Sequence, residues 1–285
     1  DLTESTQMNL FAEKFPERFI QVGVAEQNMA LVASGMANYG KIPFISSYAT
    51  FSPGRNNEQI RTTIAINNLP VKILGAHAGV SVGPDGATHQ ALEDAGLMRM
   101  IPRMTVLIPC DAVEAEKATF AAAFSSGPVY IRVGREKSPV CTTVETPFEI
   151  GKAIIFREGK DVAIIGCGML LHNALVAAEE LAEEGIDAMV INSHTLKPLD
   201  KETVIEAAKI TGAVVTVEEH QIYGGLGSAV AETLAQHLPT PIEFIGVKDR
   251  FGESGDPKEL IEAFGLGISS IKEAAKKVVA RKKSI

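Results

Sequence analysis

The sequence predicts an α/β protein with two domains, each a mainly parallel, twisted sheet with helices on both faces. Three observations support this. Short, continuous apolar runs alternate with helix-like segments, as expected for parallel strands that are covered on both sides. The alternation lapses once, between residues 136 and 159, and then resumes. With 285 residues, 46% of them hydrophobic, the chain is long enough for two ordinary domains.

The first domain is predicted over residues 1–140. Its expected strands are the apolar runs at 19–23, 41–45, 70–77, 104–109 and 128–134. Helix-like segments separate them, at residues 25–40, 58–68 and 111–126. Asp111 follows Pro109 and should cap the last of these helices, because an aspartate before a helix accepts hydrogen bonds from its first free amides.

A linker is predicted over residues 141–158, where prolines, threonines and mixed charges should lead into a short hairpin. The second domain is predicted over residues 159–285, with strands at 161–168, 187–193, 213–219 and 242–247. Its helices are expected at 171–185, 201–212 and 225–238, followed by a helical end broken near 265–267.

Composition and spacing argue against several classes of protein. The net charge of −8, with both signs interspersed, argues against a nucleic-acid binder. No apolar run approaches about 18 residues, so we expect no membrane span. Three scattered cysteines indicate reduced thiols and a cytoplasmic protein. The sequence GCG at 166–168 lacks the third glycine of a dinucleotide-binding loop, which argues against NAD.

Polar and aromatic residues collect at the expected carboxyl ends of the first domain's strands. In open α/β sheets this edge is where ligands bind. Each residue has an ordinary explanation by itself, since Phe51 could be core and Glu26 a charge at a helix start. Together they predict a binding site at one sheet edge, formed by Glu26, Tyr48, Phe51, His77, Asp85, His89 and Arg135.

Five segments resemble a known family when taken in order. They are DLTEST, GVAEQNM, SSYATF, AHAGVSVGPDGATHQALED and IRVGR. Their order and spacing resemble the pyrimidine-binding and C-terminal domains of transketolases, over essentially the whole chain. The similarity is greatest to split transketolases, whose two halves are separate polypeptides.

The resemblance implies thiamine diphosphate as cofactor. Glu26 would bind N1′ of its aminopyrimidine ring and favour the tautomer that removes the C2 proton, while Phe51 stacks on the ring and Tyr48 lines the pocket. Asp1 and Leu2 match the motif bordering the cofactor, and Val24 matches the apolar wall beneath it. His77 and Asp85 match residues that contact sugar hydroxyls. His89, Arg135 and Ser5 match residues that hold the sugar phosphate. The implied catalytic residues are Glu26, His77 and His89.

The chain lacks the Gly-Asp-Gly motif, with its downstream asparagines, that would hold the diphosphate and Mg²⁺. PDG at 84–86 lies in the sugar loop, and GDP at 255–257 opens a helix. No metal ligand is therefore expected in this chain. The resemblance implies a separate N-terminal subunit that holds Mg²⁺, self-association of this chain as a homodimer, and an α₂β₂ heterotetramer.

The implied reaction is reversible transfer of a two-carbon ketol unit from a ketose phosphate to an aldose phosphate, as in the pentose phosphate pathway. Three alternatives remain open: a deoxyxylulose-phosphate synthase, a β subunit of a 2-oxo acid dehydrogenase, and a non-catalytic α/β assembly module. The synthase branch has arginine where this chain has His77, and the dehydrogenase subunits lack a match to GPDGATHQ with both histidines. Both differences favour transketolase.

Overall fold

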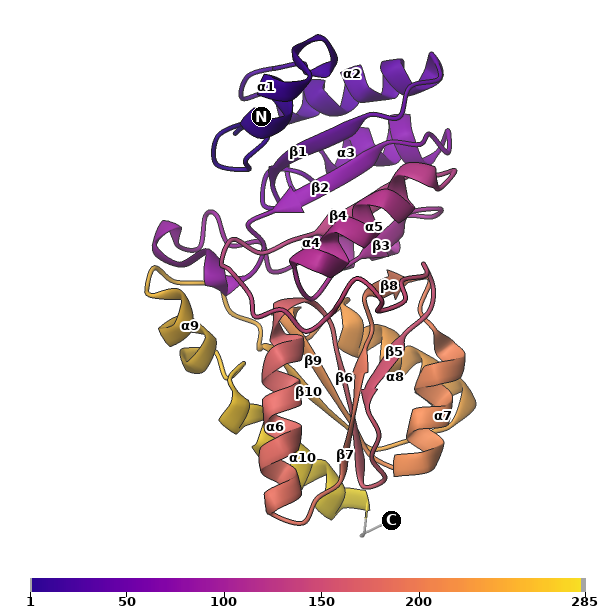
Figure 1. Ribbon diagram of the computed structural model, residues 1–285, viewed down its shortest axis with the longest axis vertical. Coiled ribbons are helices and arrows are strands. Elements are labelled where there is room, and N and C mark those ends of the chain that lie inside the picture. Colours follow the sequence, from indigo (N-terminus) through magenta and orange to yellow (C-terminus); the bar gives the residue numbers. More distant parts are fainter. Residues whose placement is uncertain (1, 283–285) are drawn as a thin grey trace.

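The computed structural model describes residues 2–282 and contains two α/β domains, one above the other in Figure 1. Each domain is built on a five-stranded sheet. The sheets have the orders β1-β2-β4-β3-β8 and β10-β9-β6-β7-β5. The two-domain α/β prediction is therefore confirmed.

The first sheet is parallel except at one edge. Strand β8 comes from the second half of the chain and pairs antiparallel with β3. The other three pairings are parallel. The strands are Phe44–Tyr48 (β1), Lys72–Ala76 (β2), Thr105–Leu107 (β3), Val129–Arg132 (β4) and Thr195–Lys197 (β8).

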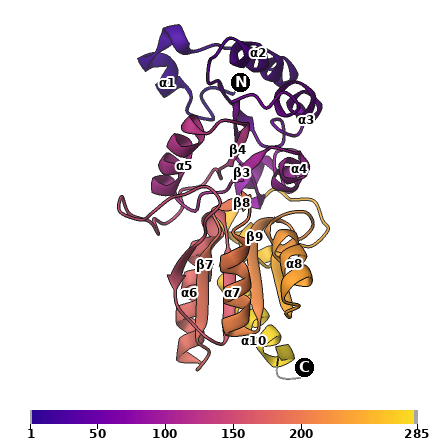
Figure 2. The same ribbon diagram turned by 90° about the vertical axis from the view of Figure 1, so that its right-hand side faces the viewer.

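Helices cover both faces of this sheet (Figures 1 and 2). Apolar residues of α2 and α4 share a core with Ile73 and Val106, whereas α5 packs on Leu107 and Ile131. The helical elements are Asn9–Lys14 (α1), Glu26–Asn38 (α2), Asn57–Gln59 (α3), the π-helix Ile60–Ala65, the 3₁₀ turns of Val80–Asp85, Asp94–Met100 (α4) and Ala112–Phe124 (α5). The side chain of Asp111 caps α5 by accepting a hydrogen bond from the amide of Glu114, as the sequence predicts.

The second sheet is parallel except for β5, which pairs antiparallel with β7. Helices α6 and α10 lie against one face, and α7 and α8 against the other (Figure 1). The elements are Ile154–Arg157 (β5), Val162–Gly166 (β6), Leu171–Glu183 (α6), Ala188–Asn192 (β7), Lys201–Thr211 (α7), Val214–Gln221 (β9), Leu226–His237 (α8), Ile242–Val247 (β10), Pro257–Ala263 (α9) and Ile268–Lys282 (α10).

Three details of the sequence prediction are wrong. Residues 19–23 form no strand, because Gly23 has a φ of 69° and interrupts the extended run just before α2. Residues 154–157 form a strand that pairs with β7 instead of a local hairpin. Tyr48 is the last residue of β1, not part of the loop after it.

No helix within residues 2–282 is long and apolar enough to cross a membrane.

The two domains share their largest hydrophobic cluster. It runs from Ile73 and Met98 of the first domain to Leu196 and Ala229 of the second. Strand β8 adds backbone hydrogen bonds between the domains. The domains are therefore packed as one body, although each has its own sheet.

A buried ion pair lies beside this junction. Arg132 donates from Nε to Asp94 Oδ2 at 2.8 Å, and the hydroxyl of Tyr130 donates to the same oxygen at 2.6 Å. Burial alone would raise the pKa of Asp94, but the positive charge of Arg132, together with His220 and the hydrogen bonds from Arg132 and Tyr130, outweighs burial and lowers the pKa. Arg132 also donates to the carbonyl of Glu219 at 2.8 Å, so this charge pair ties the first domain to the second.

We predict that Asp94→Ala lowers the free energy of unfolding by about 3–5 kcal/mol, because it leaves a buried guanidinium without its counter-charge. Urea unfolding at neutral pH measures this. The control is Glu206→Ala, which breaks an exposed pair with Lys209 and should cost less than about 1 kcal/mol. Equal losses for the two variants would contradict the assignment.

Candidate active site

Four aromatic rings meet at the carboxyl edge of the first sheet. The rings of Tyr48 and His77, at the ends of β1 and β2, stack with centroids 4.1 Å apart and an interplanar angle of 12°. Phe51 lies parallel to Tyr48 at 6.1 Å, and the edge of His89 meets Phe51 at 5.3 Å. The structure therefore brings together four predicted site residues from three separate segments.

Glu26 is the first residue of α2, and only 1% of it is exposed. Its Oε2 accepts a hydrogen bond from Arg55 Nη1 at 2.8 Å. Its Oε1 is buried and has no hydrogen-bond partner among residues 2–282. The guanidinium of Arg55 also lies over the ring of Phe51, 4.9 Å from the centroid. Arg55 thus links the buried carboxylate to the ring cluster.

Asn56 fixes the backbone around Glu26. Its fully buried Nδ2 donates to the carbonyl of Glu26 at 3.0 Å and to Ser52 Oγ at 3.1 Å. Neither Arg55 nor Asn56 is among the residues predicted from the sequence. The available signal was the polar run after Pro53 and Gly54, which follows the strand of Tyr48 and precedes an apolar segment.

His77 is half-buried in a left-handed conformation, with a φ of 54°. Burial, together with the positive charge of Arg135, lowers the pKa of His77 from 6.5 to about 4, although Asp85 opposes the shift. Its Nδ1 is buried and has no partner in the described part of the chain. The imidazole is therefore neutral at physiological pH and has a ring nitrogen available to a ligand.

Asp85 and Arg135 form an exposed ion pair next to His77, with Nη1 and Oδ2 3.4 Å apart. Arg135 also donates to the carbonyl of Val82 at 2.9 Å, which holds it against the glycine-rich loop. On the other side of the loop, His89 Nδ1 is 2.9 Å from the hydroxyl of Thr88. The edge of the site therefore carries two basic side chains and one carboxylate.

The site residues predicted near the N-terminus are Asp1, Leu2, Ser5 and Val24. Leu2 adopts a φ of 50°, and its carbonyl accepts hydrogen bonds from the amide and hydroxyl of Thr6. Ser5 is exposed, and Val24 is 78% exposed. Within residues 2–282 the structure does not bring Ser5 or Val24 into the ring cluster. Asp1 lies outside the described residues.

The described residues contain no group of three or more His, Cys, Asp or Glu side chains arranged to hold a metal ion. Neither the PDG segment at 84–86, which contains Asp85, nor the GDP segment at 255–257, which contains Asp256, forms such a group.

Comparison with known families identifies the chain. Residues 1–140 match the family description "Transketolase, pyrimidine binding domain", and residues 151–271 match "Transketolase, C-terminal domain". Together these matches cover most of the sequence. The chain belongs to the transketolase family.

Several relatives are of similar length. The chain is 43% identical over 282 residues to the 6-deoxy-6-sulfo-D-fructose transketolase subunit SqwH of Clostridium sp. (strain MSTE9), covering 99% of this chain and 88% of that protein. It is 36% identical to an apulose-4-phosphate transketolase subunit of Phocaeicola vulgatus, covering 99% of this chain and 90% of that one. A solved structure described as a split gene transketolase, inactive β4 tetramer, is 46% identical with a TM-score of 0.93, covering 99% of this chain and 91% of that one.

The lowered pKa of His77 predicts a specific pH dependence of stability. Below about pH 6.5 the unfolded chain binds a proton at this residue, whereas the folded protein does so only near pH 4. Stability should therefore fall as the pH drops from 6.5 towards 4. His77→Asn, which tolerates the positive φ, should lose less stability than the wild type between pH 7 and pH 5.

Chemical denaturation at the two pH values measures this difference. Burial also lowers the pKa of His194 to about 4, so some pH dependence should remain in the variant. If wild type and His77→Asn lose equal stability over this range, His77 is not held neutral by the fold.

Proposed function

We propose that this chain is the pyrimidine-binding subunit of a two-chain, thiamine-diphosphate-dependent transketolase. It would transfer a two-carbon ketol unit reversibly from a ketose phosphate to an aldose phosphate. The observation that carries the proposal is the buried Glu26 carboxylate beside an aromatic cluster, with one oxygen bonded to Arg55 and the other without a partner among the described residues. The names of two relatives of similar length, both transketolase subunits, support it.

The residues present fit the pyrimidine end of thiamine diphosphate. Glu26 Oε1 is a buried acceptor that has no partner in the part of the chain that the structure describes, and leaving such a group unpaired is costly. Phe51 and Tyr48 offer parallel ring faces that suit a flat heterocycle. When bound, the cofactor supplies a carbanion equivalent that attacks a sugar carbonyl.

Each proposed cofactor-binding residue has a defined task. Glu26 Oε1 holds the proton shared with N1′ of the aminopyrimidine, and Arg55 keeps Oε2 occupied so that the carboxylate presents Oε1. Phe51 stacks on the ring, and Tyr48 backs it. Leu2 borders the cofactor with Asp1, and Val24 forms the apolar wall beneath it.

The substrate is held by groups at the rim. His77, neutral at physiological pH, and Asp85 bind sugar hydroxyls near the reacting carbons. His89, Arg135 and Ser5 bind the sugar phosphate, since cationic donors form strong, charge-assisted hydrogen bonds with phosphate oxygens. The names of the two relatives refer to different sugars. For this chain we therefore propose the substrate class, sugar phosphates and related ketoses, and not an individual donor and acceptor.

A separate subunit would supply the diphosphate and Mg²⁺ site. Several apolar side chains of the N-terminal region are exposed and would be covered by partner chains: Leu10, Phe11, Ile20 and Leu31. We propose that two copies of this chain pair with each other and with two partner subunits in an α₂β₂ heterotetramer. The solved relative described as an inactive β4 tetramer supports both self-association and inactivity without a partner. Three free cysteines, two of them buried, are consistent with a cytoplasmic location.

The first test is reconstitution. The isolated chain should be inactive and indifferent to Mg²⁺, because it lacks the proposed metal site. Addition of the partner subunit should produce Mg²⁺-dependent ketol transfer, measured with xylulose 5-phosphate and ribose 5-phosphate and with sulfofructose or apulose phosphate as alternatives. Full activity of the chain alone would contradict the two-subunit assignment, and consumption of pyruvate in place of a ketose would favour the synthase alternative.

Glu26→Gln in the assembled enzyme should keep the fold and lower kcat by about 10²–10⁴-fold. The change is nearly isosteric, but an amide cannot share a proton with N1′ as a carboxylic acid does. Steady-state kinetics and thermal unfolding should be measured together. A folded variant with near-normal kcat would remove the thiamine assignment.

Replacing Arg135 by Met or His89 by Asn should selectively weaken the binding of phosphorylated sugars. Each charge-assisted hydrogen bond contributes about 1.5–3 kcal/mol, so KM should rise by about 10-fold or more for each variant. Unphosphorylated ketoses of the same chain length serve as the control substrates and should be nearly unaffected. Equal losses for both substrate types would show that these residues do not recognise phosphate.

A further inference from the structure

The loop between β2 and α4, residues 77–93, carries the proposed sugar-binding residues and is held in place largely by the second domain. We call it the substrate loop. It contains the left-handed glycines Gly79, Gly83 and Gly86 and the 3₁₀ turns of Val80–Asp85. A loop so rich in glycine gains little rigidity from its own backbone. Its conformation therefore depends on hydrogen bonds, some within the loop and others from neighbouring segments.

Glu219, near the end of β9, makes the most direct contact. It is 5% exposed, and its Oε1 accepts a hydrogen bond from the amide of Ser81 at 2.7 Å. Its carboxylate packs against Gly79, where an added Cβ would clash with Oε1, so that the carboxylate would have to move. This residue lies 138 positions from Ser81 in the sequence, so the bond joins the two domains.

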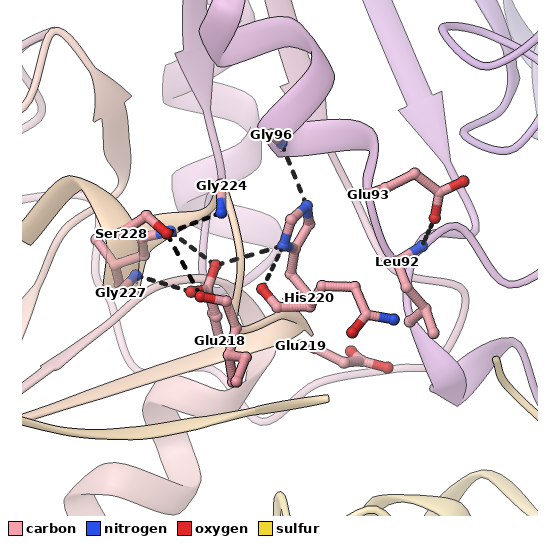
Figure 3. A network of polar contacts seen from close by, with 12 residues as sticks. Leu92, Glu93, Gly96, Glu218, Glu219, His220, Gly224, Gly227 and Ser228 are labelled. Atoms are coloured by element: carbon pink, nitrogen blue, oxygen red, sulfur yellow. Dashed lines mark hydrogen bonds and ion pairs between the residues drawn. The ribbon is translucent and has the colours of Figure 1, made fainter. Parts of the chain in front are cut away.

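Other bonds from the same strand end reinforce the contact. The amide of Gln221 donates to the carbonyl of Leu92 at 2.8 Å. The amide of Gly96, at the start of α4, donates to His220 Nε2 at 3.2 Å. Figure 3 shows Leu92, Gly96 and His220 together with Glu219. The end of β9 therefore contacts the substrate loop both at its start and at its end.

Gln90 ties the loop to a second segment of the C-terminal domain. Its buried Nε2 lies within hydrogen-bond distance of three carbonyls, donating to Val80 at 3.0 Å, to Gly83 at 3.3 Å and to Glu253 at 2.9 Å. The loop is thus closed on itself and bonded to the turn before α9.

We propose that Glu219 is a positioning residue through which the C-terminal domain sets the conformation of the substrate loop, and with it the placement of His77, Asp85 and His89 against the sugar. This rests on the proposed function for the role of the loop. It assigns the C-terminal domain a task in substrate binding in addition to any role in assembly.

The adjacent residue, Glu218, supplies a matched control. It is also a buried glutamate, 2% exposed, but its side chain turns to the other side of β9. There it accepts hydrogen bonds from the amides of Leu226 and Gly227 at 2.7 and 2.8 Å, at the start of α8. Its Oε2 also lies 3.8 Å from Nδ1 of His220, but within residues 2–282 Glu218 makes no hydrogen bond to the substrate loop itself.

The experiment compares Glu219→Ala, Glu219→Gln and Glu218→Ala in the assembled enzyme. Glu219→Ala leaves the Ser81 amide without its acceptor, so KM for the sugar should rise by about 10-fold with thiamine diphosphate affinity and kcat nearly unchanged. Glu219→Gln keeps an acceptor oxygen and should restore KM to within about 3-fold of wild type. Glu218→Ala should lower the melting temperature at least as much as Glu219→Ala but leave KM unchanged.

Hydrogen exchange of the isolated chain provides a readout that does not depend on activity. Amides at residues 85–89 do not touch Glu219, yet they should exchange faster in Glu219→Ala than in wild type or Glu218→Ala. Unchanged exchange in this segment, or an equal rise of KM in Glu218→Ala, would overturn the proposal. Absence of ketol transfer in the wild-type assembly would instead overturn the proposed function, while the exchange result would still decide whether Glu219 holds the loop.

Discussion

The site depends on one constraint: a carboxylate buried at the start of a helix needs hydrogen-bond donors, because an unpaired buried carboxylate is costly. Glu26 meets this at one oxygen only, because the half-exposed Arg55 donates to Oε2 while the buried Oε1 has no partner among residues 2–282. The same loop that delivers Arg55 also delivers Phe51, and Asn56 fixes that loop to the backbone of Glu26. The residue that pairs with Glu26 thus also contacts the ring of Phe51, which joins the buried carboxylate to the ring cluster.

The second domain also contacts this edge of the first sheet. It contributes a strand to the first sheet, shares the largest hydrophobic cluster, and bonds to the glycine-rich loop through Glu219 and Gln221. The Arg132–Asp94 pair lies at the junction of the two domains. Arg132 donates a hydrogen bond from the first domain to the carbonyl of Glu219 in the second. The two domains therefore form one packed body, and the glycine-rich loop beside the ring cluster is bonded to both.

Most elements could be predicted from the sequence, since continuous apolar runs such as those containing Ile73 and Ile164 are long enough to identify buried strands. The cap at Asp111 was also predictable, because capping depends on residues only three positions apart. Features that depend on distant partners were missed. Strand β8 is only three residues long, and its partner β3 lies in the other domain.

The same limit applies to the site. The resemblance to transketolases points to Glu26 and the ring residues, and the structure brings the rings together, but the roles themselves remain proposals. The ion pair of Glu26 with Arg55 spans 29 residues, and the bond of Glu219 to the loop spans 138, so no local pattern reveals either. For the second contact the sequence offers a hint, because two consecutive glutamates in the apolar strand AVVTVEE place a carboxylate on each face, and each carboxylate needs a partner.

The most direct test of the account is a binding measurement on the assembled enzyme. Calorimetry should compare thiamine diphosphate with an analogue that carries C–H in place of N1′, for wild type and for Glu26→Ala. If Glu26 Oε1 is reserved for N1′, wild type should bind the analogue about 10-fold or more weakly than the cofactor, and the difference should vanish in Glu26→Ala. Equal affinity of wild type for the two molecules would contradict the central claim that the free oxygen of Glu26 is a cofactor contact.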